Sequence, residues 1–201
     1  MKTAHIVAQL GLYAQAEFLD LVLCSEMRSE IDGAAQVCSK VYRGGESILD
    51  EHERRSLSAL VSDRKRSLIR RRLDALIPQL EAHFDVTLRG CQPPSFLVYA
   101  KGDHFKPHTD SGAGPGTPQY ISKRKLSAVI FLNRGCTKPS RGCYCGGALT
   151  LYNLVDNPDS SNVRTPVLGE EGLLMVFPSE VFHEVCPVTW GQRYTIVSWF
   201  F

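Results

Sequence analysis

The sequence lacks a long apolar run, a regular cysteine spacing and a strong excess of charge of either sign. No window approaches the roughly 20 apolar residues of a membrane-spanning helix, so no membrane association is expected. The net charge is only +2, which by itself indicates no particular partner. No internal repeat or low-complexity segment is present. With 43% apolar residues among 201, the sequence predicts a single globular domain over residues 1–201.

The seven cysteines are an odd number without regular spacing, which favours free thiols in a reducing compartment over a disulfide framework. Cys136, Cys143 and Cys145 are grouped, but structural zinc usually has four ligands in paired spacing. Free thiols in a mobile loop are therefore expected there, with an incidental disulfide as the alternative. The apolar stretch after Lys2 is interrupted by polar residues, unlike that of a signal peptide. Together these features predict a cytoplasmic protein.

Helical spacing of apolar residues dominates the first ninety residues. One stripe predicts a helix over Gln15–Ile31, and a second predicts a longer helix over Ile69–Phe84 that Pro78 should kink or split. The segment Arg54–Arg72 is basic, but it contains no aromatic residue on which a nucleic-acid base could stack. We therefore favour a solvated helix face for this segment, and a nucleic-acid partner is not expected.

After residue 91 the apolar residues instead form short runs separated by Gly, Pro and Asn, as is typical of strands. The expected strands are Ser95–Ala100, His104–Asp110, Lys125–Asn133, Ala148–Tyr152, Val163–Val167, Gly172–Phe177, Phe182–Cys186 and Arg193–Phe201. This pattern favours a sandwich or jelly-roll barrel over a parallel α/β sheet. We expect a mainly β (α+β) fold in which residues 1–90 form a helical support and residues 91–201 the β core. Two long loops, Ser111–Arg124 and Arg134–Gly146, are candidates for a functional role.

A candidate metal site begins with His108 and Asp110 at the end of one expected strand. Residues two apart on a strand point to the same face, and His183 on another expected strand could supply a third ligand. Two histidines and one carboxylate that leave other coordination positions open are typical of an Fe(II) oxygenase. Taken alone, the His-x-Asp pair is weak evidence, since a surface histidine beside a carboxylate gives the same pattern. His104 lies a full pleat from the pair and is expected in a loop or at the substrate entrance.

Arg193 opens the last apolar strand, on the same face as Thr195, Val197 and Trp199. A lone guanidinium on a buried face is costly unless it is paired, and this strand carries no carboxylate. An external dicarboxylate would supply the partner, because a guanidinium binds a carboxylate through two parallel hydrogen bonds. Thr195 could add a hydroxyl donor. The alternative is that Arg193 pairs with a glutamate such as Glu184 or extends to solvent.

These candidate residues lie in segments that resemble prolyl 4-hydroxylase-type oxygenases. The similar segments span most of the chain: Arg54-Arg55-Ser56 before a long helix, Tyr99–Asp110, Leu126–Asn133, Gly146-Gly147, His183–Arg193 and Trp199. The resemblance implies a double-stranded β-helix, a cupin-like jelly roll, with Fe(II) and 2-oxoglutarate bound at its mouth. It makes His108, Asp110 and His183 the iron ligands and catalytic residues.

The resemblance also implies that Arg193 binds the distal carboxylate of 2-oxoglutarate and that Tyr99 hydrogen-bonds this co-substrate. The implied reaction consumes O2, decarboxylates 2-oxoglutarate to succinate and hydroxylates an unactivated C–H bond, commonly with ascorbate as a reductant. Many collagen-type prolyl hydroxylases use lysine where this chain has Arg193, so the chain is nearer the oxygen-sensing and bacterial members. A prolyl residue of a protein or peptide is the expected substrate. The alternatives are a free amino acid or other small metabolite, a nucleic acid, and a catalytically silent cupin-like binding module.

Overall fold

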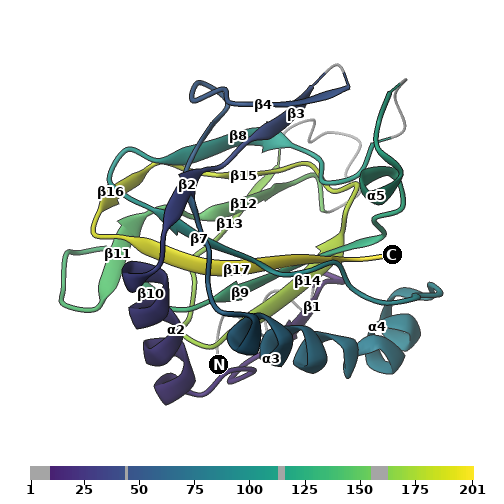
Figure 1. Cartoon of the computed structure of the whole chain (residues 1–201), viewed down its shortest axis with the longest axis horizontal. Coiled ribbons are helices and arrows are strands. Elements are labelled where there is room, and N and C mark those ends of the chain that lie inside the picture. Colours follow the sequence, from purple (N-terminus) through teal and green to yellow (C-terminus); the bar gives the residue numbers. More distant parts are fainter. Residues whose placement is uncertain (1–9, 44, 113–115, 155–162) are drawn as a thin grey trace.

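The structure, a computed structural model, describes residues 10–43, 45–112, 116–154 and 163–201 (Figure 1). The helices are α2 (Leu21–Gly33), α3 (Asp63–Asp74), α4 (Ile77–Phe84) and α5 (Gln119–Ser122). The strands of the N-terminal part are β1 (Tyr13–Gln15), β2 (Gln36–Cys38), β3 (Val41–Arg43), β4 (Glu46–Ile48), β5 (Arg54–Arg55) and β6 (Leu57–Ala59). Those that follow are β7 (Ser95–Tyr99), β8 (His104–His108), β9 (Leu126–Phe131), β10 (Arg134–Gly135), β11 (Cys143–Gly146), β12 (Leu149–Tyr152), β13 (Arg164–Val167), β14 (Leu174–Pro178), β15 (His183–Val185), β16 (Val188–Trp190) and β17 (Arg193–Phe200).

Two antiparallel sheets form the core. The larger sheet has the strand order β1-β14-β9-β17-β7-β6-β2, and the smaller has the order β13-β12-β15-β8-β5. A further sheet, β10-β11-β16, and the β3–β4 hairpin complete the β structure. Both core sheets combine strands that are distant in sequence, because the chain winds from one sheet to the other as in a double-stranded β-helix. The expected mainly β jelly-roll core is therefore present.

The strand β17 contributes one face to the apolar core and the other to a pocket. Its residues Tyr194, Ile196 and Phe200 are buried in one cluster with apolar residues of α2, α3 and α4. The alternate residues from Arg193 to Trp199 line the pocket between the two core sheets. This is the arrangement that alternation along the strand predicted.

The three longer helices cover the outer face of the larger sheet (Figure 1). The helix α3 ends at Asp74, and α4 begins at Ile77 with Pro78 in its first turn, so the predicted split of this helix is confirmed. The helix predicted over Gln15–Ile31 starts too early. Asp20 caps α2 by accepting a hydrogen bond from Leu23 N at 2.8 Å, and the residues of β1 pair with β14 instead.

The first ninety residues contribute short strands to both core sheets in addition to the expected supporting helices. The strands β1, β2 and β6 belong to the larger sheet, and β5 belongs to the smaller. Each of these strands has only two or three residues. Such a length is too short for apolar alternation to reveal a strand in the sequence. The β3–β4 hairpin lies over the same side of the fold as β8 (Figure 1).

The segment Arg134–Gly146 differs from the expected loop with free thiols. It contains β10 and β11, and β11 pairs with both β10 and β16. Cys136 and Cys143 form a disulfide, so the expectation of free thiols is wrong for this pair. Their sulfurs meet because the parallel β10–β11 pairing places Cys143 opposite Arg134, close to Cys136. Cys145 is a buried free thiol.

Two other expectations fall partly outside the described residues. The interrupted apolar stretch after Lys2 lies almost wholly within residues 1–9, and residues 113–115 of the loop Ser111–Arg124 are also outside. The described part of that loop contains α5. None of the described helices is long and apolar enough to cross a membrane. The compartment stays a prediction.

Candidate metal and co-substrate site

A pocket of about 460 Å³ lies between the two core sheets. Its walls come from β7, β9 and β17 on one side and from β8 and β15 on the other, and residues of the β3–β4 hairpin and α5 also line it. The six residues that the sequence singled out as metal or co-substrate ligands all line this pocket: His108, Asp110, His183, Arg193, Tyr99 and Thr195. The fold thus gathers residues from four strands and one loop position.

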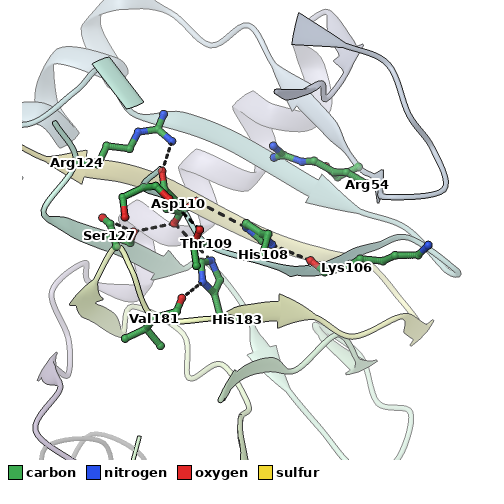
Figure 2. Close-up of polar contacts among 12 residues, drawn as sticks. Arg54, Lys106, His108, Thr109, Asp110, Arg124, Ser127, Val181 and His183 are labelled. Carbon is green, nitrogen blue, oxygen red and sulfur yellow. Dashed lines mark hydrogen bonds and ion pairs between the residues drawn. The ribbon is translucent and has the colours of Figure 1, made fainter. Parts of the chain in front are cut away.

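His108, Asp110 and His183 form a compact cluster (Figure 2). The pairing of β8 with β15 places His183 directly opposite His108. Nε2 of His108 lies 3.7 Å from Asp110 Oδ1, and Nε2 of His183 lies 3.4 Å from Asp110 Oδ2. One ligand atom from each residue lies within 4.8 Å of the other two, so a single ion can contact all three.

The second ring nitrogen of each histidine is held by a backbone carbonyl. Nδ1 of His108 lies 2.8 Å from Lys106 O, and Nδ1 of His183 lies 2.8 Å from Val181 O (Figure 2). Because a carbonyl only accepts, Nδ1 carries a proton in both rings, and loss of the proton from Nε2 makes the lone pair of that nitrogen available to a metal. This orientation of a histidine by a partner behind it is usual at metal centres.

The Asp110 carboxylate is oriented by two buried serines that sequence reasoning missed. Ser127 Oγ donates to Asp110 Oδ2 at 2.7 Å, and Ser179 Oγ lies 2.9 Å from Ser127 Oγ. Asp110 N also donates to Ser179 O at 2.9 Å. With Oδ2 engaged in this way, Oδ1 is the better placed oxygen for a metal. The available signal was a serine inside the apolar run Leu126–Leu132.

The charges of the three residues depend on one another. Burial raises the pKa of the Asp110 carboxyl, but the charge of His183 and hydrogen bonds from both histidines outweigh burial and hold this pKa well below its usual range. Burial lowers the pKa of His108. Burial also acts to lower the pKa of His183, but the Asp110 charge outweighs it and raises that pKa. A divalent cation would replace the His183 proton as the partner of Asp110.

Arg193 lies at the other end of the pocket. It is the largest fully buried side chain among the described residues, with 1% of its surface exposed. Its Nη1 donates to Thr195 Oγ1 at 3.2 Å, but its Nε has no hydrogen-bond partner. Within the described part of the chain, no carboxylate forms an ion pair with it. Glu184, the alternative partner, instead accepts a hydrogen bond from Tyr152 at 2.6 Å. A buried guanidinium with an unmet donor in a pocket fits a carboxylate ligand.

Tyr99 is directly opposite Arg193 in the β7–β17 register. The centre of the Tyr99 ring lies 5.2 Å from the guanidinium carbon, and the Phe131 ring lies 5.3 Å from it on β9. The Tyr99 hydroxyl makes no hydrogen bond with any described residue, so it is free to bind a ligand. His104 is not part of the cluster: its ring nitrogens lie 3.2 Å from His52 O and 3.3 Å from Gly102 O.

Residues 94–201 match the family model of the 2OG-Fe(II) oxygenase superfamily, in which 2OG stands for 2-oxoglutarate. The chain belongs to this superfamily. It is 30% identical over 178 residues to a PKHD-type hydroxylase of Bordetella pertussis, in an alignment that covers 87% of this chain and 71% of the relative. It is 31% identical over 107 residues to a PKHD-type hydroxylase of Shewanella sp. (strain ANA-3), which covers 53% of this chain and 42% of that relative. The chain thus spans less than half the length of the Shewanella relative.

One solved structure with a similar fold is that of a Pseudomonas putida prolyl-4-hydroxylase. The TM-score is 0.71 at 22% identity, and the match covers 99% of this chain and 96% of that one. A prolyl hydroxylase from Trichoplax adhaerens, in complex with a hypoxia inducible factor peptide fragment, matches with a TM-score of 0.66 at 19% identity over 99% of this chain and 87% of that one. At these identities the likeness establishes the fold alone, which supports the double-stranded β-helix.

The residues present fit the two groups that the superfamily name implies. The two Nε2 atoms and one carboxylate oxygen are the donor set of a facial Fe(II) site with open positions. The unmet Nε donor of the buried Arg193 fits a carboxylate such as those of 2-oxoglutarate.

Proposed function

We propose that this chain is an Fe(II)- and 2-oxoglutarate-dependent hydroxylase that acts on a prolyl residue of a protein or peptide. The observation that carries the proposal is that one pocket holds both a two-histidine, one-carboxylate cluster and a buried arginine without an internal carboxylate partner. A barrel that only bound a metal would have no need of the arginine, and a carboxylate-binding protein would have no need of the cluster.

In this proposal, His108, Asp110 and His183 hold Fe(II). The carbonyls behind the two imidazoles fix the Nε2 lone pairs on the ion, and Ser127 fixes the carboxylate. These contacts position the three ligands before the metal arrives, which lowers the cost of assembling the site.

Arg193 would bind the distal carboxylate of 2-oxoglutarate, with the Tyr99 hydroxyl as a further donor. Thr195 Oγ1 accepts from Arg193, so its own hydroxyl proton is free to donate to the same carboxylate. The apolar side chains around this end, including Leu97, Val129 and Val197, exclude water and strengthen the charge pair.

Bound Fe(II) would supply the oxidising chemistry by which O2 and 2-oxoglutarate yield succinate, CO2 and one hydroxyl group on the substrate. The chain's own residues would hold the co-substrate at one end of the pocket and leave the other end to the substrate. The names of the relatives support hydroxylation: they are PKHD-type hydroxylases. The Pseudomonas and Trichoplax proteins, which share the fold, are named as prolyl hydroxylases, and this supports a prolyl substrate.

The test is succinate formation from 2-oxoglutarate with Fe(II), O2 and ascorbate. The panel contains prolyl peptides, free proline, free lysine and methylated oligonucleotides. We expect succinate to rise with at least one prolyl peptide, together with a mass gain of one oxygen on that peptide. Turnover with a free amino acid or an oligonucleotide alone would replace the prolyl assignment. Failure to convert 2-oxoglutarate under any condition, with Fe(II) bound, would refute the oxygenase itself.

A further inference from the structure

The substrate end of the pocket carries more positive charge than the proposed reaction requires. Its lining includes five cationic side chains besides Arg193: Lys40, Arg43, Arg54, Lys106 and Arg124. Among the described residues, the only carboxylates in the lining are those of Glu53 and Asp110. Fe(II) and Arg193 together would balance the charges of 2-oxoglutarate and Asp110, so the co-substrate end is neutral without these five cations.

Two of the five cations are neutralised within the protein. Arg43 lies 3.5 Å from Asp50 and 3.7 Å from Glu53, and Lys106 lies 3.5 Å from Glu53. Lys40 is exposed on the rim. Arg54 and Arg124 remain, and in the part of the chain that the structure describes neither forms an ion pair with a carboxylate.

Arg54 is held rigidly at the pocket wall without a charge partner. Its guanidinium carbon lies 4.6 Å from the centre of the Phe105 ring, and that ring is stacked on His108 with 3.5 Å between ring centres. Its Nε donates to Ser56 Oγ at 3.1 Å and its Nη1 to Lys40 O at 3.4 Å. The Nη2 donors have no described partner, so an anion can take them.

Arg124 is held in the same manner on the other side. Its guanidinium carbon lies 3.7 Å from the centre of the Trp199 ring. Its Nε donates to Gln92 Oε1 at 3.1 Å, and its Nη1 donates to Asp110 O at 3.1 Å. Figure 2 shows Arg54 and Arg124 extending toward the metal-ligand cluster from opposite directions. Stacking fixes the plane of each guanidinium, so little entropy is lost when a carboxylate binds.

We infer that the substrate is an acidic peptide, with a carboxylate side chain on each side of the residue that is hydroxylated. This inference rests on the proposed function, since it concerns the substrate of the same site. One carboxylate would bind Arg54 and the other Arg124, while the reacting carbon lies between them over the cluster. An acidic segment would also be attracted to Lys40 on the rim.

The location of the positive charge favours a peptide over a nucleic acid. The other basic segment, on α3, packs on the outer face of the larger sheet, whereas the pocket is on the inner face. The larger sheet therefore separates the cations of α3 from those of the pocket, whereas a nucleic-acid strand usually binds along a continuous basic track.

The experiment uses two labelled peptides, each with a central proline. One has a glutamate on each side of the proline, and its twin has glutamine at both positions. Binding is measured by fluorescence anisotropy on the protein loaded with Mn(II) and 2-oxoglutarate. We expect the glutamate peptide to bind about tenfold tighter per arginine engaged, and the difference to shrink as salt is raised.

Arg54→Gln and Arg124→Gln should each reduce the preference for the glutamate peptide about tenfold. Arg71→Gln, an exposed arginine on α3, is the matched control and should keep it.

Three results would overturn the inference. They are equal binding of the two peptides, binding of neither, and displacement of the acidic peptide by single-stranded RNA more effectively than by unlabelled peptide. Fe(II)-dependent 2-oxoglutarate consumption is measured in parallel without any peptide. If this consumption is present while the preference is absent, the substrate inference fails and the oxygenase stands. If 2-oxoglutarate is consumed under no condition, with either peptide or without one, the proposed function fails.

Discussion

Arg193 distinguishes an oxygenase from a barrel that only binds metal. A charge-assisted hydrogen bond contributes about 1.5–3 kcal/mol, and about 1.4 kcal/mol corresponds to tenfold in affinity. Arg193→Ala should therefore raise the Kd of 2-oxoglutarate roughly ten- to a hundredfold, measured by calorimetry on the Mn(II)-loaded protein. Arg193→Lys should be intermediate, because it keeps the charge but loses the planar fork.

Metal affinity in the absence of 2-oxoglutarate serves as the internal control for the arginine variants. The guanidinium contacts Thr195 and two aromatic rings and makes no contact with the histidines. Arg193→Ala should therefore bind Mn(II) as wild type does. An unchanged Kd for 2-oxoglutarate in this variant would contradict the assignment of Arg193.

Ser127 should act on the metal through Asp110. Its hydroxyl is buried and donates to Asp110 Oδ2, so Ser127→Ala leaves that oxygen without its donor. Loss of a partner behind a ligand typically costs roughly 10- to 100-fold in metal affinity, and we expect that loss in Fe(II) titrations. Ser127→Thr keeps the hydroxyl and should restore most of the affinity.

The matched control for Ser127 is Ser198→Ala. Ser198 is equally buried and donates to Gln92 O at 2.7 Å, but it faces away from the pocket. Both alanine variants should lose similar thermal stability, whereas only Ser127→Ala should lose metal affinity. Equal metal affinity in the two variants would mean that Ser127 is merely a structural residue.

The residues of the site were predictable to different degrees. His108, His183 and Arg193 could be found because each lies on a strand where alternation fixes the side that a residue faces, and Asp110 because it follows His108 by two positions. Ser127 and the two unpaired arginines, Arg54 and Arg124, were not found as site residues. The role of Ser127 depends on which strands become neighbours. The roles of the arginines depend on the aromatic ring on which each guanidinium stacks. Neither kind of contact can be read from a single sequence.

At the scale of elements, the turn between β11 and β12 packs against the side chain of Arg193. Gly147 in this turn has φ +58°, and a Cβ there would lie 2.9 Å from Val188 Cγ2 and 3.1 Å from Arg193 Cδ. Gly147→Ala should therefore displace the arginine and raise the Kd of 2-oxoglutarate severalfold. Gly142→Ala is the matched control, because Gly142 has φ +80° but no neighbouring atom within 4 Å of a Cβ.

Both glycine variants strain the backbone by about 1–2 kcal/mol, so both should lower the thermal midpoint. Gly147→Ala should lower it further, because its Cβ also meets Val188. Only Gly147→Ala adds the contact with Arg193. If the two variants bind 2-oxoglutarate equally well, the turn does not position the arginine.

The strands of the C-terminal part were predictable where they are long and apolar, as for β9 and β17. The strands β11 and β16 were missed, because each has only three or four residues and adjoins glycine or proline. The disulfide was only the alternative to free thiols for the same reason: without β11, nothing in the sequence places Cys143 near Cys136. Short edge elements are fixed by their partners rather than by their own residues.

At the scale of the whole molecule, the free thiols report on how the helices pack against the larger sheet. Cys24 on α2 and Cys91 beside β17 are buried between the helices and this sheet. Burial raises the pKa of the Cys24 thiol to about 11, and burial together with a hydrogen bond to Asp74 raises the pKa of Cys91 to about 12. A raised thiol pKa leaves little reactive thiolate at mildly alkaline pH.

We therefore expect iodoacetamide to label the folded protein in a fixed order, followed by intact-mass and peptide mass spectrometry. Cys38 is exposed and should react first, and the partly buried Cys186 should follow. Cys24, Cys91 and Cys145 should react only after denaturation, while Cys136 and Cys143 should also require a reductant. Denatured and reduced protein should take up seven labels, which calibrates the assay. Cys38→Ser should remove the fast phase alone. Rapid labelling of Cys24 or Cys91 in folded protein would contradict the packing of the helices on the larger sheet, because only an open interface would admit the reagent.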